Sequence, residues 1–216
     1  MINYEKERSR MVDEQIIGRG VKDERVLAVM RKIPRHEFLP EAIRGMAYGD
    51  NALPLGEGQT ISQPYMVALM TEAIGVHGGE HVLEVGTGSG YQAAVLAELG
   101  VRVLTLERLP DLAAHARALL GALGYLDRVT VEVADGTLGE SAGAPYDAIL
   151  VTAAAPQIPR PLIKQLAPHG CLVLPMGEED LQSLVRLRRG AEGLVEEYLG
   201  ECRFVKLLGS YGWEDS

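Results

Sequence analysis

The sequence has little cysteine, no long apolar run and no surplus of basic residues, and each shortage excludes a class of protein. Among its 216 residues only Cys171 and Cys202 are cysteines, too few for a disulfide framework or a cysteine-rich metal site. We therefore expect a reduced, cytoplasmic compartment. The start of the chain is charged and lacks the apolar core of a signal peptide. No apolar run approaches the roughly 20 residues that cross a bilayer, so we expect no membrane segment.

The charge balance is acidic. The formal net charge is -9 at pH 7 and the pI is about 5.1, whereas binders of nucleic acid or anionic membranes need basic surface. We expect neither partner, and we expect a monomer. His77 and His81 are spaced like a metal-binding pair on a helix, but two glycines between them disfavour a helix. We therefore expect no metal.

The order of apolar segments predicts one α/β domain. Five short runs are typical of buried strands in a parallel sheet with helices between them: 82–85, 101–106, 129–133, 146–151 and 171–175. Two later segments, 181–188 and 194–208, predict an antiparallel hairpin that closes the sheet. Helical periodicity over 11–19 and 23–32 predicts helices near the N-terminus.

The predicted fold is a doubly wound, mostly parallel Rossmann-like sheet with a C-terminal antiparallel hairpin and an N-terminal helical extension. We expect a single domain over residues 1–216, with the extension over 1–60 and the Rossmann-like core over 61–216.

The most informative stretch is Val-Leu-Glu-Val-Gly-Thr-Gly-Ser-Gly-Tyr, residues 82–91. A strand, three alternating glycines and a helix-forming run place backbone N–H groups at a helix N-terminus, where anions bind. Glycine allows positive φ and close approach of a ligand. In a doubly wound sheet this edge is where ligands bind. Three glycines in a turn that binds no ligand would weaken the fold and contribute nothing to it. We therefore favour a ligand-binding loop over a plain glycine-rich turn.

The spacing of this loop favours a cationic cofactor over a dinucleotide. The fingerprint G-x-G-x-x-G needs its third glycine one residue later, where Tyr91 stands. Glu84, two residues before the first glycine, would repel a pyrophosphate but attract an ammonium or a sulfonium. S-adenosylmethionine carries both cations. The loop thus resembles the cofactor loop of class I methyltransferases.

Two further acids follow the next two predicted strands. Glu107 lies about 20 residues beyond the first glycine, the position from which a carboxylate reaches ribose hydroxyls. Asp135 is placed to accept a hydrogen bond from an exocyclic amine such as that of adenine. Because the carboxyl ends of parallel strands meet at one edge, we expect Glu84, Glu107 and Asp135 to lie around the same cofactor.

A second stretch, Gly-Glu-Gly-Gln-Thr-Ile-Ser-Gln-Pro-Tyr-Met over residues 56–66, precedes a predicted helix that begins at Pro64. Ser62 or Gln63 would be its N-cap. Ser62 could cap the helix alone, or it could also bind an anion at the positive helix end. No histidine or lysine stands beside Ser62 in sequence, so a serine nucleophile has no local support.

Several blocks of the chain resemble one family, the protein-L-isoaspartate O-methyltransferases. They are Gly-Gln-Thr-Ile-Ser-Gln-Pro-Tyr-Met-Val-Ala (58–68), Val-Leu-Glu-Val-Gly-Thr-Gly-Ser-Gly-Tyr (82–91), Tyr-Asp-Ala-Ile-Leu-Val-Thr-Ala-Ala-Ala-Pro (146–156) and Leu-Ala-Pro-His-Gly (166–170). Arg-His-Glu-Phe (35–38) and Tyr-Gly-Asp (48–50) are similar to the family's N-terminal region. The likeness covers nearly the whole chain, except that Lys206 stands where proline is frequent.

The resemblance implies methyl transfer from S-adenosylmethionine, which becomes S-adenosylhomocysteine, to the free α-carboxyl of L-isoaspartyl residues in damaged proteins and peptides. The ester then collapses to a succinimide, which begins repair. The family's active-site serine falls on Ser62. Its cofactor contacts fall on Glu84, Gly86, Thr87, Gly88, Glu107, Asp135 and Gly136.

Three alternatives stay open on the sequence alone. One is a class I methyltransferase that acts on a small molecule or RNA, although the acidic balance disfavours RNA. The second is an NAD(P)-dependent oxidoreductase, against which Glu84 and Tyr91 argue. The third is a module that holds the cofactor without catalysis.

Overall fold

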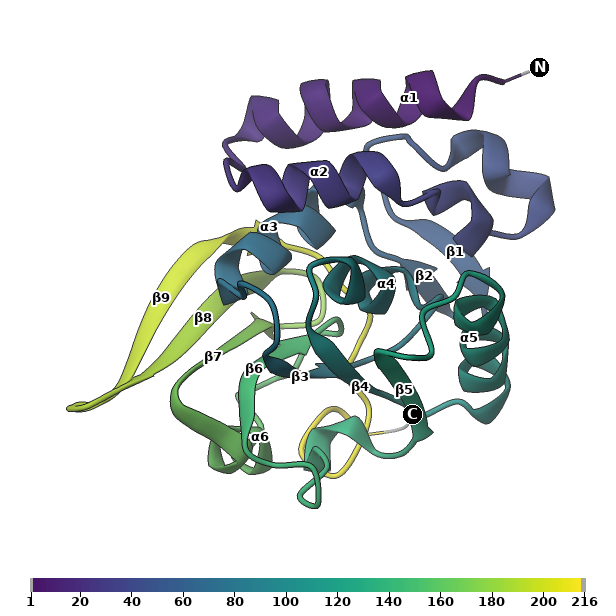
Figure 1. The fold of residues 1–216 in the computed structure, drawn as a ribbon. Coiled ribbons are helices and arrows are strands. Elements are labelled where there is room, and N and C mark those ends of the chain that lie inside the picture. The colour runs from purple at the N-terminus through teal and green to yellow at the C-terminus, as the bar shows by residue number, and fades with distance from the viewer. Residues whose placement is uncertain (1, 215–216) are drawn as a thin grey trace.

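A seven-stranded sheet in the order β5-β4-β3-β6-β7-β8-β9 forms the centre of the molecule (Figure 1). The computed structural model describes residues 2–214. The strands are β3 His81–Val85, β4 Arg102–Glu107, β5 Val129–Val133, β6 Tyr146–Val151, β7 Leu166–Gly177, β8 Gln182–Gly190 and β9 Gly193–Cys202. Strands β5, β4, β3, β6 and β7 pair in parallel, whereas β7, β8 and β9 pair antiparallel. The predicted mostly parallel sheet with a C-terminal hairpin is confirmed.

Helices cover both faces of the sheet. Along β3, Val82 belongs to one buried cluster and Leu83 and Val85 to another, because successive side chains of a strand point to opposite faces. Helices α3 (Pro64–Ile74), α4 (Tyr91–Glu98) and α5 (Pro110–Ala122) pack on the first face, and α6 (Arg160–Gln165) packs on the second. Burial on both faces explains the nearly continuous apolar strands in the sequence.

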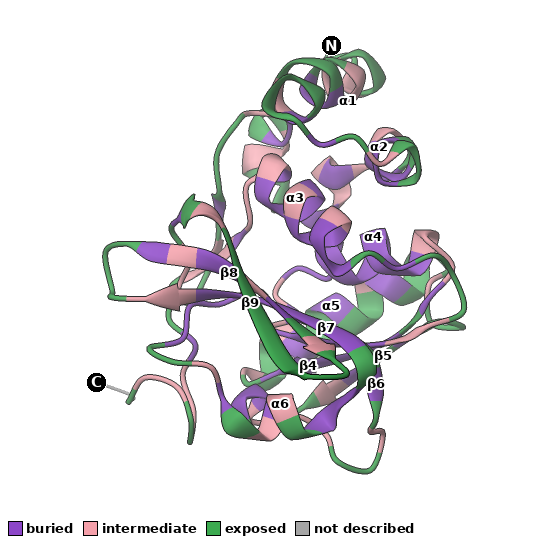
Figure 2. Cartoon of the chain, turned by 90° about the vertical axis from the view of Figure 1, so that its left-hand side faces the viewer, coloured by how far each residue is buried: buried purple, intermediate pink, exposed green. Residues whose placement is uncertain are grey.

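The N-terminal segment forms an outer layer over α3 and α4 (Figures 1 and 2). It contains α1 (Tyr4–Met11), a π-helical segment (Val12–Ile16), a 3-10 turn (Ile17–Arg19) and α2 (Glu24–Lys32). The first helix begins earlier than predicted because only Met11 of α1 is buried, so its polar first turns carry no apolar periodicity. Asp23 caps α2 as predicted. Within residues 2–214 no helix is long and apolar enough to span a membrane.

A two-stranded hairpin between the N-terminal layer and the core was not predicted. It consists of β1 (Leu53–Gly56) and β2 (Gln59–Ile61), and residues 56–58 of its turn all have positive φ. Strands this short, set among prolines and glycines, give no alternating pattern that distinguishes them from a loop. Two 3-10 segments, Arg35–Phe38 and Glu41–Met46, precede the hairpin.

The last predicted strand is shorter than expected. Strand β9 ends at Cys202, so residues 203–208 leave the hairpin and cross the edge of the sheet. There Ala154 pairs with the backbone on either side of Lys206: its N–H donates to Val205 and its carbonyl accepts from Leu207, each at 2.8 Å. The C-terminal stretch is thereby fixed beside the end of β6.

Candidate functional site

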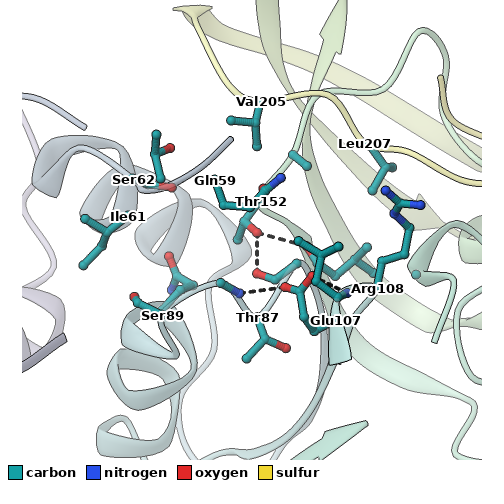
Figure 3. Close-up of a pocket in the computed structure, with 18 of the residues that line it drawn as sticks. Gln59, Ile61, Ser62, Thr87, Ser89, Glu107, Arg108, Thr152, Val205 and Leu207 are labelled. Carbon is teal, nitrogen blue, oxygen red and sulfur yellow. Dashed lines mark hydrogen bonds between the residues drawn. The ribbon is translucent and has the colours of Figure 1, made fainter. Parts of the chain in front are cut away.

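A cavity lies at the carboxyl edge of β3, β4 and β6 (Figure 3). Four stretches supply most of its wall: residues 59–62, the glycine loop that begins at Gly86, residues 106–109 and residues 205–208. Figure 3 shows Ser62, Thr152 and Glu107 around it. The sheet edge therefore brings together segments that are far apart in sequence, as expected for a doubly wound fold.

The three loop glycines adopt conformations that side chains disfavour. Their φ angles are 95° at Gly86, 53° at Gly88 and 85° at Gly90. At Gly86 an added Cβ would also lie 2.4 Å from the Oγ1 of Thr152. The Thr152 hydroxyl donates to the Gly86 carbonyl at 2.6 Å. Glycine is thus required both by the backbone turn and by the close approach of β6.

The backbone amides of this loop are largely occupied within the protein. The N–H of Gly86 donates to the Leu106 carbonyl at 2.8 Å, and that of Gly90 donates to the Thr87 carbonyl at 2.8 Å. The N–H of Gly88 donates to Glu107 at 2.9 Å. This differs from our expectation that the loop amides would serve an anion, because here they brace the loop itself.

Glu107 ends β4 and contributes to the cavity wall. Its side chain is 7% exposed. The two carboxylate oxygens accept from the backbone of Gly88 at 2.9 Å and of Leu109 at 3.1 Å. A carboxylate offers about four acceptor positions, so Glu107 retains capacity for hydroxyl donors in the cavity.

Glu84 occupies a different place from the one we expected. It is fully buried and is not among the residues that line the cavity. Its position in β3 turns it to the same face as Thr105, its register partner on β4. Neither carboxylate oxygen makes a hydrogen bond of good geometry with the described residues. The Thr105 hydroxyl is near enough to favour the ionised form, but it is shared with the Thr87 hydroxyl at 2.7 Å. An orphaned buried carboxylate is costly and indicates a missing ligand, ion or water.

Burial raises the pKa of Glu84 to about 8; the Thr105 hydroxyl opposes this shift and the Glu107 charge adds to it. Glu84 is therefore mostly protonated at neutral pH in the ligand-free protein. A cation bound near it would favour the ionised form. The residues at this edge fit a cationic cofactor because the acid is present, buried and unpaired.

Asp135 is not among the residues that line the cavity either, although Gly136 beside it is in the wall. Its carboxylate accepts from the N–H of Thr137 at 2.9 Å and from the N–H of Ser210 at 2.8 Å. Partial burial works to raise the pKa of Asp135, but the bonds from Ser210 and Thr137 outweigh it and hold the pKa below its usual value. An added Cβ on Gly209 would lie 2.2 Å from this carboxylate. The C-terminal segment therefore covers Asp135.

Ser62 lies where two cavities meet. A second cavity of about 570 Å³ adjoins the first, and Thr60, Ser62 and Val205 line both. The N-cap of α3 is Gln63, and no side chain caps this helix. Of the two N-cap candidates, Ser62 and Gln63, the structure places Gln63 at the cap, so helix capping by Ser62 is wrong; Ser62 lies on the wall that the two cavities share. Cationic and aromatic side chains line the second cavity: Arg19, Arg203, Tyr65 and Phe204.

Six of the eight predicted site residues line the first cavity, namely Ser62, Gly86, Thr87, Gly88, Glu107 and Gly136. The sequence did not reveal Thr152 or the wall formed by residues 205–208, since both arise from the packing of distant segments. Within residues 2–214 no three His, Cys, Asp or Glu side chains are grouped to hold a metal ion. That the protein uses no metal stays a prediction.

Comparison with known sequences points in one direction. The sequence profile described as protein-L-isoaspartate(D-aspartate) O-methyltransferase matches residues 6–212. A protein-L-isoaspartate O-methyltransferase 1 of Syntrophobacter fumaroxidans is 55% identical over 99% of this chain and 100% of its own length. A protein-L-isoaspartate O-methyltransferase 2 of Geotalea uraniireducens is 56% identical over 99% of this chain and 98% of its own length.

Solved structures agree with the sequences. A protein-L-isoaspartate O-methyltransferase superposes with a TM-score of 0.82 at 28% identity, over 96% of this chain and 67% of the other. A candidate enzyme of the same name from Plasmodium falciparum, solved with S-adenosyl-L-homocysteine, gives a TM-score of 0.79 at 25% identity, over 93% of this chain and 98% of the other. From the profile match and the full-length relatives, this chain belongs to the protein-L-isoaspartate O-methyltransferase family.

Proposed function

We propose that this protein transfers the methyl group of S-adenosylmethionine to the free α-carboxyl of L-isoaspartyl residues in damaged proteins and peptides. The observation that carries this proposal is the position of Ser62 on the wall shared by two cavities. One cavity lies beside the glycine loop and Glu107, and the other opens on the far side of Ser62 and is large enough for a peptide side chain. Donor and acceptor would meet at this serine.

The first cavity is the place we assign to the cofactor. Gly86, Thr87 and Gly88 shape its loop, Glu107 would accept from ribose hydroxyls, and Glu84 would balance the positive charge. The bound cofactor supplies an electrophilic methyl on a sulfonium. For Asp135 to accept from adenine, its carboxylate must keep one acceptor position while Ser210 and Thr137 hold it. Gly136 gives the adenine a wall without a side chain.

The acceptor needs no general base. An α-carboxyl group has a pKa of roughly 3.5 and is ionised at neutral pH. The protein has to align one carboxylate oxygen with the methyl group, about 3 Å away, and exclude water. Ser62 can donate a hydrogen bond that aims the carboxylate. It takes no proton and forms no covalent bond in this scheme.

Repair follows from the product. Methoxide is a far better leaving group than the oxide of a carboxylate, so the backbone nitrogen of the next residue attacks the ester carbonyl; the C–OCH3 bond breaks, methanol leaves with the amide proton, and the succinimide closes. Hydrolysis of the succinimide then yields some normal aspartate. The enzyme's task ends with the ester.

The test is methyl transfer from labelled S-adenosylmethionine to a pair of peptides that differ only in an isoaspartyl or an aspartyl linkage. We expect labelling of the isoaspartyl peptide and none of its partner. Equal labelling, or labelling of neither peptide together with labelling of a small molecule or RNA, would favour the alternative class I methyltransferase. Calorimetry with NAD, for which we expect no binding, separates the oxidoreductase alternative.

We further propose that residues 1–216 form a single domain, since one buried cluster joins Val12 and Met30 of the N-terminal layer to Val82 and Ala148 of the sheet. Isoaspartyl peptides are the proposed partners. A monomeric state, a cytoplasmic location and the lack of nucleic-acid or membrane partners stay predictions from composition.

A further inference from the structure

Arg35 is a buried arginine that holds the backbone at Ser62. Its side chain is 0% exposed. Nε donates to the Ala47 carbonyl at 2.8 Å, and Nη2 donates to the Ser62 carbonyl at 2.8 Å. Its guanidinium carbon lies 5.0 Å from the ring centroid of Tyr91, the first residue of α4. One side chain thus connects the N-terminal layer, the Ser62 segment and the helix that follows the glycine loop.

No carboxylate balances this charge among residues 2–214. The charged or polar groups that influence Arg35 are the hydroxyls of Tyr91 and Tyr48, and Nη1 has no hydrogen-bond partner. Burial lowers the pKa of Arg35 to about 10, so the group is still cationic at neutral pH. A buried charge without a counterion costs several kcal/mol. Such a group is expected to have an anionic partner that the folded chain itself does not supply.

The proposed substrate supplies that anion. The α-carboxylate would dock at the Ser62 hydroxyl, on the residue whose carbonyl Arg35 holds. We propose that Arg35 is a positioning residue that fixes Ser62 through its backbone and selects an anionic acceptor by charge, without touching it. This inference rests on the proposed function, because it takes the isoaspartyl carboxylate as the anion.

The size of the effect follows from Coulomb's law. At a separation of ~7 Å and an effective dielectric of ~20, the charge favours a bound anion by on the order of 10- to 50-fold. Salt should change this little because the charge is buried, whereas the exposed Arg203 in the second cavity is screened. The acceptor carboxylate loses its charge as it takes the methyl group. The effect of the charge should therefore appear in KM for the peptide, whereas any displacement of Ser62 would appear in kcat.

The experiment compares two ligands in three proteins. The ligands are an isoaspartyl peptide and the same peptide with its α-carboxyl replaced by a carboxamide, each titrated into protein saturated with S-adenosylhomocysteine. The proteins are wild type, Arg35→Met and Arg35→Lys. Arg189→Met is the control: Arg189 is partly buried and, like Arg35, has one guanidinium nitrogen without a hydrogen-bond partner, but it lies on β8 and donates to the Ile163 carbonyl.

We expect Arg35→Met to lower the carboxylate-to-carboxamide affinity ratio on the order of 10- to 50-fold, equally at low and high salt. Arg35→Lys should keep the ratio within about threefold, and Arg189→Met should leave it unchanged. A purely structural role of Arg35 would weaken both ligands alike, and that result would overturn the proposal. If Arg35→Met does not fold, Arg35→Lys decides: a lysine variant whose ratio collapses contradicts selection by charge. A wild-type protein that binds neither peptide would instead refute the proposed function.

Discussion

Replacement of Glu84 by glutamine should make the ligand-free protein more stable and its cofactor binding weaker. Glu84 is fully buried, and neither of its oxygens makes a hydrogen bond of good geometry with residues 2–214. Its pKa rises to about 8 from an ordinary value of 4.5. Glutamine has nearly the same shape and carries no charge, so the substitution removes the titration and little else.

The direction and the size of the change in stability follow from the linkage between proton binding and folding. Below pH 4.5 the Glu84 carboxyl is protonated in both the folded and the unfolded chain, so its ionisation does not change the free energy of unfolding. Between pH 4.5 and 8 the unfolded chain loses the proton and the folded chain keeps it, so folded stability falls as pH rises. At pH 7 this cost is about 3 kcal/mol. Glu84→Gln should recover much of it, a rise of roughly 6–12 °C in Tm for a chain of this size.

The assay has two parts, thermal unfolding across pH and calorimetry of S-adenosylmethionine binding in buffers of different ionisation enthalpy. The gain in Tm should vanish near pH 4.5. At pH 7 the wild type should release up to about 0.9 proton more than Glu84→Gln, as the bound cation ionises the carboxyl. Glu80→Gln is a control of opposite sign, because bonds from the His77 and Gly78 amides outweigh burial and hold the pKa of Glu80 below its usual value. A Glu84→Gln protein that is less stable, with the same proton release and cofactor affinity, would refute this reasoning.

Three single substitutions and one double mutant test the remaining parts of the site. Ser62→Ala should lower kcat about 10- to 100-fold with cofactor Kd within twofold, because one orienting hydrogen bond is lost; unchanged kcat argues against that role. Glu107→Ala should raise the cofactor Kd by about 30-fold or more, since the loss of even one bond to a carboxylate costs ~1.5–3 kcal/mol, and an unaltered Kd counts against the ribose assignment. Gly86→Ala should lower the free energy of unfolding by about 2 kcal/mol or more. Adding Thr152→Ala should recover part of that loss by removing the hydroxyl 2.4 Å from the new Cβ, and a purely additive double mutant would contradict the clash.

The sheet could be predicted from sequence because its strands are buried on both faces. Runs such as 82–85 and 146–151 are mostly apolar, and the structure places the buried strands β3 and β6 there. The edge strand β5, at 129–133, instead shows an alternation of apolar and polar residues. The β1–β2 hairpin could not be predicted, since three or four residues between glycines carry no period. The path of residues 203–208 depends on pairing with Ala154 after β6, which is a contact across the chain that no local pattern records.

The sequence predicted which segments form the site better than it predicted which way their side chains point. The glycine spacing located the loop, and the spacing of the acids located three strand ends. Whether an acid faces the cavity depends on the strand's alternation and on neighbours, so Glu84 is buried and Asp135 is held by Ser210. The burial of Arg35 could not be predicted, because no local pattern distinguishes a buried arginine in a charged stretch from an exposed one; only the fold reveals that it is buried without a counterion.

The most direct test of the account is a structure of this protein with S-adenosylhomocysteine and an isoaspartyl peptide bound together. We predict that the α-carboxylate accepts a hydrogen bond from the Ser62 hydroxyl at the junction of the two cavities, with one oxygen directed at the cofactor sulfur. A complex in which the cofactor lies away from the glycine loop and Glu107, or in which the isoaspartyl carboxylate binds elsewhere than at Ser62, would contradict it.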